Sequence, residues 1–144
     1  LAATGAYIVL MVVADGVASR RTAAEARAAG VDVQDVMVAP VPANPFAGDV
    51  VVATGDAYHL GQFRWLRRPH VEWHGSPLPA GERDETVLAT LRLPAVRNFL
   101  RWSRYPFVAV QETDDGYLVR FGDARYPGQM RGGLGGITVR VDRH

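Results

Sequence analysis

One stretch decides how the chain folds: Arg97-Asn98-Phe99-Leu100-Arg101-Trp102-Ser103-Arg104-Tyr105-Pro106-Phe107. Read at 100° per residue, its apolar arc consists of Val96, Phe99, Leu100 and Ser103, with Trp102 on the flank. The arc roughly opposite consists of Arg97, Arg101 and Arg104. Pro106 stops the helix and begins a strand. The stretch therefore predicts an amphipathic helix that covers the apolar face of the strands around it.

The strand signals on both sides of this helix form two hairpins. Alternation and turn residues predict strands at 31–41, 49–54, 57–66, 107–112, 117–121 and 137–141, with a short strand at 70–74. Gly55-Asp56 and Asp114-Asp115-Gly116 supply the two hairpin turns. A short helix is expected over 82–91 with Asp84 as its N-cap, and a Gly-rich loop over 122–136. The expected fold is α+β, with a mostly antiparallel sheet.

The chain opens with an apolar segment. Residues 1–14 carry no charge, and these 14 residues are about two-thirds of the roughly 20 that a membrane helix needs. One interpretation is the end of a transmembrane helix, with Arg20, Arg21 and Arg27 on the cytoplasmic side. The other is a packing helix that continues to Gly30. The chain begins inside the run and without Met, so we expect a piece of a longer protein.

The domain expectation follows from length. With 144 residues, of which 48% are hydrophobic and 22% charged, residues 31–144 form one expected α+β domain after the helix 1–30. The net charge of +1 argues against a nucleic-acid partner held by electrostatic attraction. The absence of Cys excludes disulfides and thiolate metal sites in this sequence.

Two sets of residues are candidate sites. His70, Glu72 and His74 alternate on one face of a short strand, and two imidazoles with a carboxylate can hold zinc. A solvent-facing strand edge carries polar residues at the same spacing. The candidate binding residues, an Arg and aromatic set suited to an anionic ligand or a protein, are Arg97, Arg101, Trp102, Arg104, Asp123, Arg125 and Tyr126. The alternatives are a solvated Arg face and a local ion pair of Asp123 with Arg125. No catalytic triad or carboxylate dyad can be assembled from the sequence.

The order of these elements is similar to that of a known family. The matching pieces are an apolar helix with a basic, Ala-rich end; Val36-Met37-Val38-Ala39-Pro40-Val41-Pro42-Ala43-Asn44-Pro45; a hairpin with Tyr58 and Gly61; Phe99-Leu100-Arg101-Trp102-Ser103-Arg104-Tyr105-Pro106; and Phe121-Gly122-Asp123-Ala124-Arg125-Tyr126. Together they resemble the C-terminal region of a bacterial family of inner-membrane-associated metal-dependent hydrolases, also described as LexA-binding. The stretch Phe46-Ala47-Gly48-Asp49 departs from that family's pattern, in which a Trp often follows the turn.

The resemblance implies a membrane-bound hydrolase whose metal-binding His and Asp residues lie in an N-terminal half absent from this sequence. We therefore expect an accessory domain on the cytoplasmic face of the inner membrane. The divalent metal would belong to the full-length protein, with none in this chain. The alternatives are a binding module that engages a protein or anionic ligand, or a second copy of the chain, and an independent hydrolase using His70, Glu72 and His74.

Overall fold

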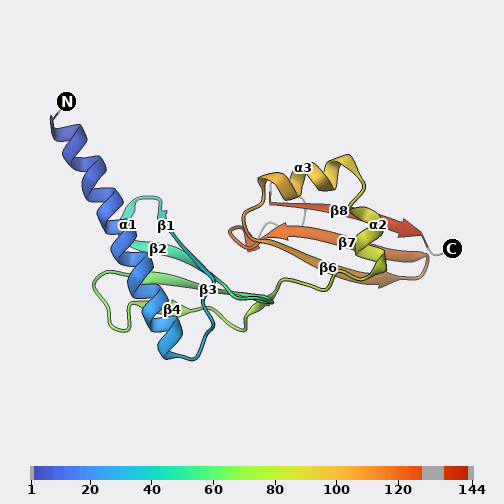
Figure 1. Ribbon diagram of the computed structural model, residues 1–144, viewed down its shortest axis with the longest axis horizontal. Coiled ribbons are helices and arrows are strands. Elements are labelled where there is room, and N and C mark those ends of the chain that lie inside the picture. The colour runs from blue at the N-terminus through green and yellow to red at the C-terminus, as the bar shows by residue number, and fades with distance from the viewer. Residues whose placement is uncertain (1, 128–134, 143–144) are drawn as a thin grey trace. The chain divides into compact units, whose positions relative to one another are not determined.

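The structure is a computed structural model that describes residues 2–127 and 135–142 (Figure 1). It confirms the expected α+β class, with a long N-terminal helix and antiparallel sheets. The chain divides into two compact units, Leu1–Pro77 and Leu78–His144. This division falls inside the range 31–144, which the sequence predicts as one domain.

The first unit is an antiparallel sheet with one helix against it. Its strands pair in the order β1 (Asp35–Val41), β2 (Asn44–Ala53), β3 (Ala57–Arg64) and β4 (Val71–Trp73). The tight turn between β1 and β2 places Ala43 at φ 62°. Strand β2 begins at Asn44, five residues before the expected Asp49, because Asn44 and Pro45 already have the extended backbone that the residue before a proline favours.

Helix α1 (Ala2–Ala28) covers one face of this sheet with its second half only. Ala18 and Ala26 pack in a cluster with Val50, Val52 and Phe63. The helix ends in a Schellman arrangement: the Gly30 N–H donates to Arg27, the Val31 N–H donates to Ala26, and Gly30 has φ 84°. Residues 2–13, in contrast, are exposed. One continuous helix therefore has a docked half and an unpacked apolar half.

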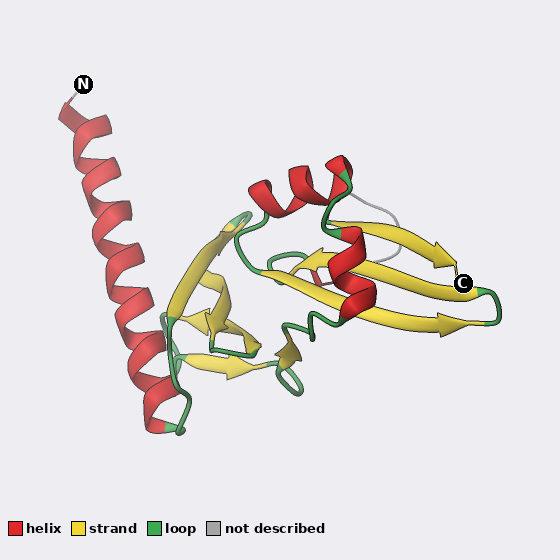
Figure 2. Ribbon diagram, turned by 45° about the vertical axis from the view of Figure 1, so that its right-hand side comes forward, coloured by secondary structure: helices red, strands yellow, loops and turns green. Residues whose placement is uncertain are grey.

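The second unit is a three-stranded antiparallel sheet with helices on one face (Figure 2). After the short β5 (Leu78–Pro79) come α2 (Glu85–Thr90), α3 (Pro94–Trp102), β6 (Pro106–Thr113), β7 (Gly116–Asp123) and β8 (Gly136–Asp142). The predicted caps are present: the Asp84 side chain accepts from the Val87 N–H, and Pro94 occupies the first turn of α3. Part of the expected Gly-rich loop, residues 128–134, lies outside the described residues.

The predicted apolar arc of α3 faces this sheet. Val96 is fully buried with Val87, Val119 and Phe121, and Phe99 and Leu100 pack against that cluster. The sequence predicts Ser103 on the same arc, but α3 ends at Trp102 and Ser103 is its C-cap. The connection from Ser103 to Pro106 therefore leads directly from helix into strand, and it is the place where a polar site forms.

Candidate functional site

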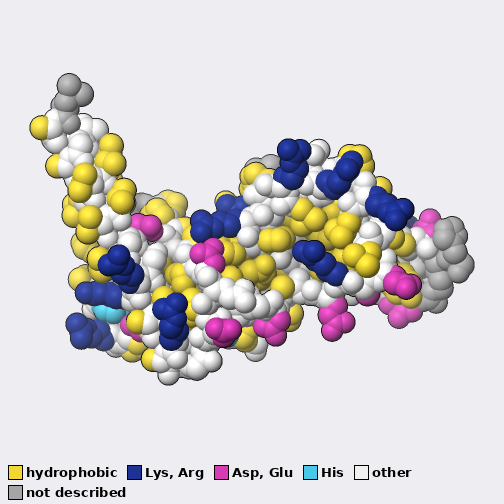
Figure 3. All heavy atoms as spheres, in the orientation of Figure 1, with side chains coloured by type: hydrophobic (Ala, Val, Ile, Leu, Met, Phe, Trp, Pro, Cys, Tyr) yellow, Lys and Arg dark blue, Asp and Glu magenta, His cyan; other side chains and the backbone are white. Residues whose placement is uncertain are grey.

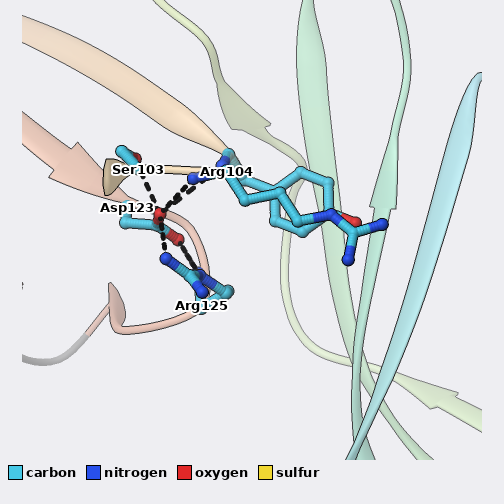
Figure 4. A network of polar contacts seen from close by, with 5 residues as sticks. Ser103, Arg104, Asp123 and Arg125 are labelled. Carbon is cyan, nitrogen blue, oxygen red and sulfur yellow. Dashed lines mark hydrogen bonds and ion pairs between the residues drawn. The ribbon is translucent and has the colours of Figure 1, made fainter. Parts of the chain in front are cut away.

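The polar site of the second unit is built around one carboxylate, Asp123 (Figure 4). Asp123 is the last residue of β7, and its pairing partner in the register is Pro106, the first residue of β6. Its side chain is completely buried. The chain thus brings a charged group to the junction between α3 and β6, where backbone N–H groups that follow the helix donate to it.

One oxygen of Asp123 serves this junction. Asp123 Oδ2 accepts hydrogen bonds from Ser103 Oγ at 2.6 Å, from the Arg104 N–H at 2.9 Å and from the Tyr105 N–H at 3.4 Å. These donors belong to three consecutive residues of the connection between α3 and β6. The carboxylate therefore holds the end of the helix to the end of β7.

The other oxygen of Asp123 serves Arg125. Asp123 Oδ1 accepts from the Arg125 backbone N–H and from Arg125 Nε, each at 2.9 Å, and Arg125 Nη2 donates to Oδ2 at 2.9 Å. This confirms the predicted local ion pair. Burial alone would raise the pKa of Asp123, but the hydrogen bonds from Arg125 and Ser103 and the charge of Arg125 lower it from 3.8 to about 2. Asp123 is thus an ionised carboxylate with its acceptor positions occupied.

Two aromatic side chains lie beside the Arg125 guanidinium. Its central carbon lies 4.9 Å from the ring centre of Trp102 and 5.4 Å from that of Tyr126. The two rings are themselves nearly parallel, with centroids 6.1 Å apart and an interplanar angle of 14°. Trp102 is 50% exposed and Tyr126 is 39% exposed. The part of this site that meets solvent is therefore aromatic.

The structure brings together most, but not all, of the predicted binding residues. The side chains of Trp102, Asp123, Arg125 and Tyr126 form one cluster. Arg104 contributes its backbone N–H, while its side chain points away from Asp123 and lies over the Tyr105 ring at 5.2 Å (Figure 4). Two further arginines, Arg97 and Arg101, are exposed on α3. The Asp123 carboxylate has no proton to give and no vacant position to accept one, so it holds the connection between α3 and β6 and positions Arg125.

Of the three residues of the metal hypothesis, two have separate partners and the third is exposed. The His70 ring uses both nitrogens: Nε2 accepts from Arg21 Nη1 at 3.1 Å, and Nδ1 donates to the Arg64 carbonyl at 3.1 Å. Glu72 pairs with Arg64 and Arg67 at 3.4 and 3.6 Å. His74 is exposed beyond the end of β4. Within residues 2–127 and 135–142, no three His, Cys, Asp or Glu side chains are grouped so that they could hold a metal ion.

Sequence reasoning missed the residue that places His70, which is Glu25. Its two carboxylate oxygens accept the backbone N–H groups of His70 at 2.8 Å and Val71 at 2.9 Å, and so join α1 to the start of β4. The His70 ring also stacks on Phe63, with centroids 5.4 Å apart. A Glu within an Ala-rich helix carries no local signal for a partner 45 residues away.

Comparison with known proteins leaves the chain without a match. No family model, curated protein or solved structure is similar to it. The resemblance to the membrane-associated hydrolases therefore stays a prediction from the sequence.

Proposed function

We propose that this chain is an accessory domain of a membrane-bound metal-dependent hydrolase, with the apolar half of α1 in the bilayer and the catalytic residues outside residues 1–144. In this role the chain holds its two units at the membrane surface and supports a site formed elsewhere in the protein. The order of sequence motifs supports the hydrolase part of the proposal. The division of α1 into two halves supports the membrane part.

The unpacked half of α1 carries the proposal. Seven consecutive large apolar side chains, Tyr7 to Val13, are between 42% and 66% exposed. Removing side chains of this kind from water is worth on the order of 10 kcal/mol in total at about 1.5–3 kcal/mol each. The helix of 27 residues is long and apolar enough to span a membrane. A bilayer is the surrounding that would bury these side chains on all sides of one helix.

The side chains of the docked half support a rigid connection to the membrane. Ala18, Thr22 and Ala26 are buried against the first unit. Arg21 and Glu25 add hydrogen bonds to His70 and to the start of β4. No loop intervenes between these contacts and the apolar turns, so the position of the helix in the membrane would determine the position of the sheet.

The charged residues after the apolar turns favour a cytoplasmic location. Arg20 and Arg21 follow the run within about two helical turns and Arg27 within about four, and basic residues beside a membrane segment tend to remain on the cytoplasmic side. We therefore place the two units at the cytoplasmic face of the inner membrane. Asp123, His70 and Glu72 already have protein partners, which favours a supporting role over a catalytic one.

The test is membrane retention of the full chain. Bacterial membranes holding the wild type, a Leu10→Arg/Val12→Arg variant and a Leu88→Arg/Val110→Arg control are washed with alkaline carbonate. All four positions are exposed in the structure, so none of the variants disturbs a core. We expect the wild type and the control to stay with the membrane and the first variant to be released. Release of the wild type, or retention of all three, would contradict the proposal.

A second candidate function rests on the exposed rings of Trp102 and Tyr126 beside the arginines of α3. Aromatic side chains held rigidly by a neighbouring Arg are typical anchors of protein interfaces. Replacement of Arg97 and Arg101 with Gln, together with Trp102→Ala, should then weaken capture of a protein partner by the full-length protein. Unchanged capture would remove this candidate and leave the membrane role in place.

A further inference from the structure

Two exposed apolar side chains belong to neighbouring segments at one end of the first sheet. Leu66 follows β3 and is 80% exposed, and Phe46 near the start of β2 is 56% exposed. The two segments are joined, because the Trp65 N–H donates to the Phe46 carbonyl at 3.0 Å. We call the segment Trp65–Pro69 together with Phe46 the interface loop. Large apolar side chains exposed at a loop tip are typical of a surface that contacts a partner or a membrane.

The interface loop lies beside α1 just beyond its apolar turns. Arg21 lies over the Trp65 ring, 5.8 Å from its centre, and the same guanidinium bonds to His70 next to the loop. Arg21 is six residues after Asp15, the first charge, which is about 9 Å along a helix. The headgroup layer on each side of a bilayer is about 5–8 Å thick. If the helix leaves the hydrocarbon near Asp15, Trp65 lies close to the headgroups, where Trp is enriched.

The charge around the interface loop suits an anionic surface. The basic residues in or next to this loop are Arg64, Arg67 and Arg68, and Arg21 of α1 contacts it. Glu72 is shared by Arg64 and Arg67, and Glu25 is directed to backbone N–H groups. Figure 3 shows basic side chains gathered beside the middle of α1, below its apolar turns. The region thus carries surplus positive charge next to exposed apolar groups.

We propose that the interface loop is a second membrane contact of the first unit, specific for anionic phospholipids. Phe46 and Leu66 enter the boundary between headgroups and acyl chains, and Arg67 and Arg68 bind lipid phosphates. This inference rests on the proposed membrane placement of α1 and adds a lipid preference to it. The docking of α1 to the sheet presents the loop to the bilayer. Each Arg near an anionic surface should contribute about a five-fold gain in binding.

The natural chain contains no Cys, so single labels can be placed without removing native residues elsewhere. The full chain with Leu66→Cys carries an environment-sensitive fluorophore, and Asp56→Cys is the matched control. Asp56 is exposed in the turn between β2 and β3, at the opposite end of the same hairpin. Both proteins are reconstituted in vesicles of phosphatidylcholine, alone or mixed with phosphatidylglycerol, with and without brominated acyl chains.

We expect brominated lipids to quench the label at position 66 several-fold more than the label at 56, and more strongly with phosphatidylglycerol. Adding Arg67→Gln and Arg68→Gln should remove the dependence on phosphatidylglycerol. Equal quenching at 66 and 56, in a chain that floats with the vesicles, overturns the inference and leaves the anchoring by α1 intact. If the label at position 66 is quenched equally with and without phosphatidylglycerol, the preference for anionic lipids is overturned. A chain that does not float with vesicles overturns the anchoring and, with it, this inference.

Discussion

Asp123 connects parts of the second unit that are 20 residues apart in sequence. Its bond to Ser103 crosses from the end of β7 to the end of α3, and its pairing with Arg125 holds the guanidinium beside two exposed rings. Because a buried carboxylate without donors is costly, the cluster is stable only when all of its members are present. Loss of Asp123 should therefore also disorder the Trp102 and Tyr126 surface.

The first prediction concerns the pH dependence of Asp123→Asn. Hydrogen bonds in the folded protein hold the pKa of Asp123 at about 2, below the unfolded value of 3.8, so folding favours the ionised form. This stabilisation, on the order of 2 kcal/mol, is complete above about pH 4 and is lost as the pH falls toward about 2. Urea titrations should show the variant less stable than the wild type near neutrality, with the difference shrinking in acid. A difference that stays constant with pH would contradict the assigned cause.

The second prediction concerns Glu25→Gln in α1. An amide keeps one acceptor oxygen and turns an N–H₂ group toward the other backbone N–H, so one of the bonds to His70 and Val71 is lost. We expect a decrease of about 1–3 kcal/mol in the free energy of unfolding. Glu82→Gln is the control, because Glu82 is exposed and should change stability by less than about 0.5 kcal/mol. Equal effects of the two substitutions in urea denaturation would rule out the role of Glu25.

At the scale of elements, the strand β6 depends on a glycine before α2. Gly81 has φ 88°, and a Cβ there would overlap the carbonyl oxygen of Val108. The neighbouring Ala80 carbonyl accepts the Val108 N–H at 2.9 Å, which holds the two backbones together. A larger residue at position 81 would therefore have to separate this segment from β6.

The third prediction compares Gly81→Ala with Gly30→Ala. Gly30 has a similar φ of 84°, but a Cβ at this position would meet no atom within 4 Å. Its substitution therefore reports backbone strain alone, about 1 kcal/mol. Gly81→Ala adds the overlap with Val108 and should cost about 1–3 kcal/mol more. Thermal unfolding followed by circular dichroism can separate the two. A Gly81 variant no less stable than the Gly30 variant would show that β6 shifts without penalty.

The elements that sequence predicted well are those with local causes. Asp84, Pro94 and the turn at Asp114–Gly116 act on their own neighbours, so their structural roles follow from residue type and spacing. The candidate site was found in part for the same reason, because Asp123 and Arg125 are close in sequence. Glu25 was missed, since its partners are set by how α1 lies on the sheet. The division at Pro77 lies within the segment 75–81, which is rich in Gly and Pro and is equally typical of a loop inside one domain.

At the scale of the whole molecule, the fourth prediction concerns membrane orientation. Arg20, Arg21 and Arg27 favour a cytoplasmic location for both units. Protease added to inverted membrane vesicles should digest residues 31–144, and protease added outside spheroplasts should not. Arg20→Glu/Arg21→Glu is expected to weaken this bias, whereas Arg97→Glu/Arg101→Glu, far along the chain, should leave it unchanged. Digestion from outside the spheroplast would place the units in the periplasm and contradict the prediction.

If the apolar turns of α1 lie in a membrane, as we propose, the uninterrupted helix also fixes the rotation of the first sheet about the helix axis relative to the bilayer. Each residue turns a helix by about 100°, so one alanine inserted near Gly16 would swing the sheet around the helix axis by that angle while moving it only about 1.5 Å outward. Seven inserted residues would return the sheet nearly to its original rotation about the helix axis, about 10 Å farther from the membrane. With a flexible linker in place of the helix, such insertions would not change the orientation of the sheet. For any partner that binds one side of this chain, a change in the length of α1 would therefore alter the direction of the binding surface more than its distance from the membrane.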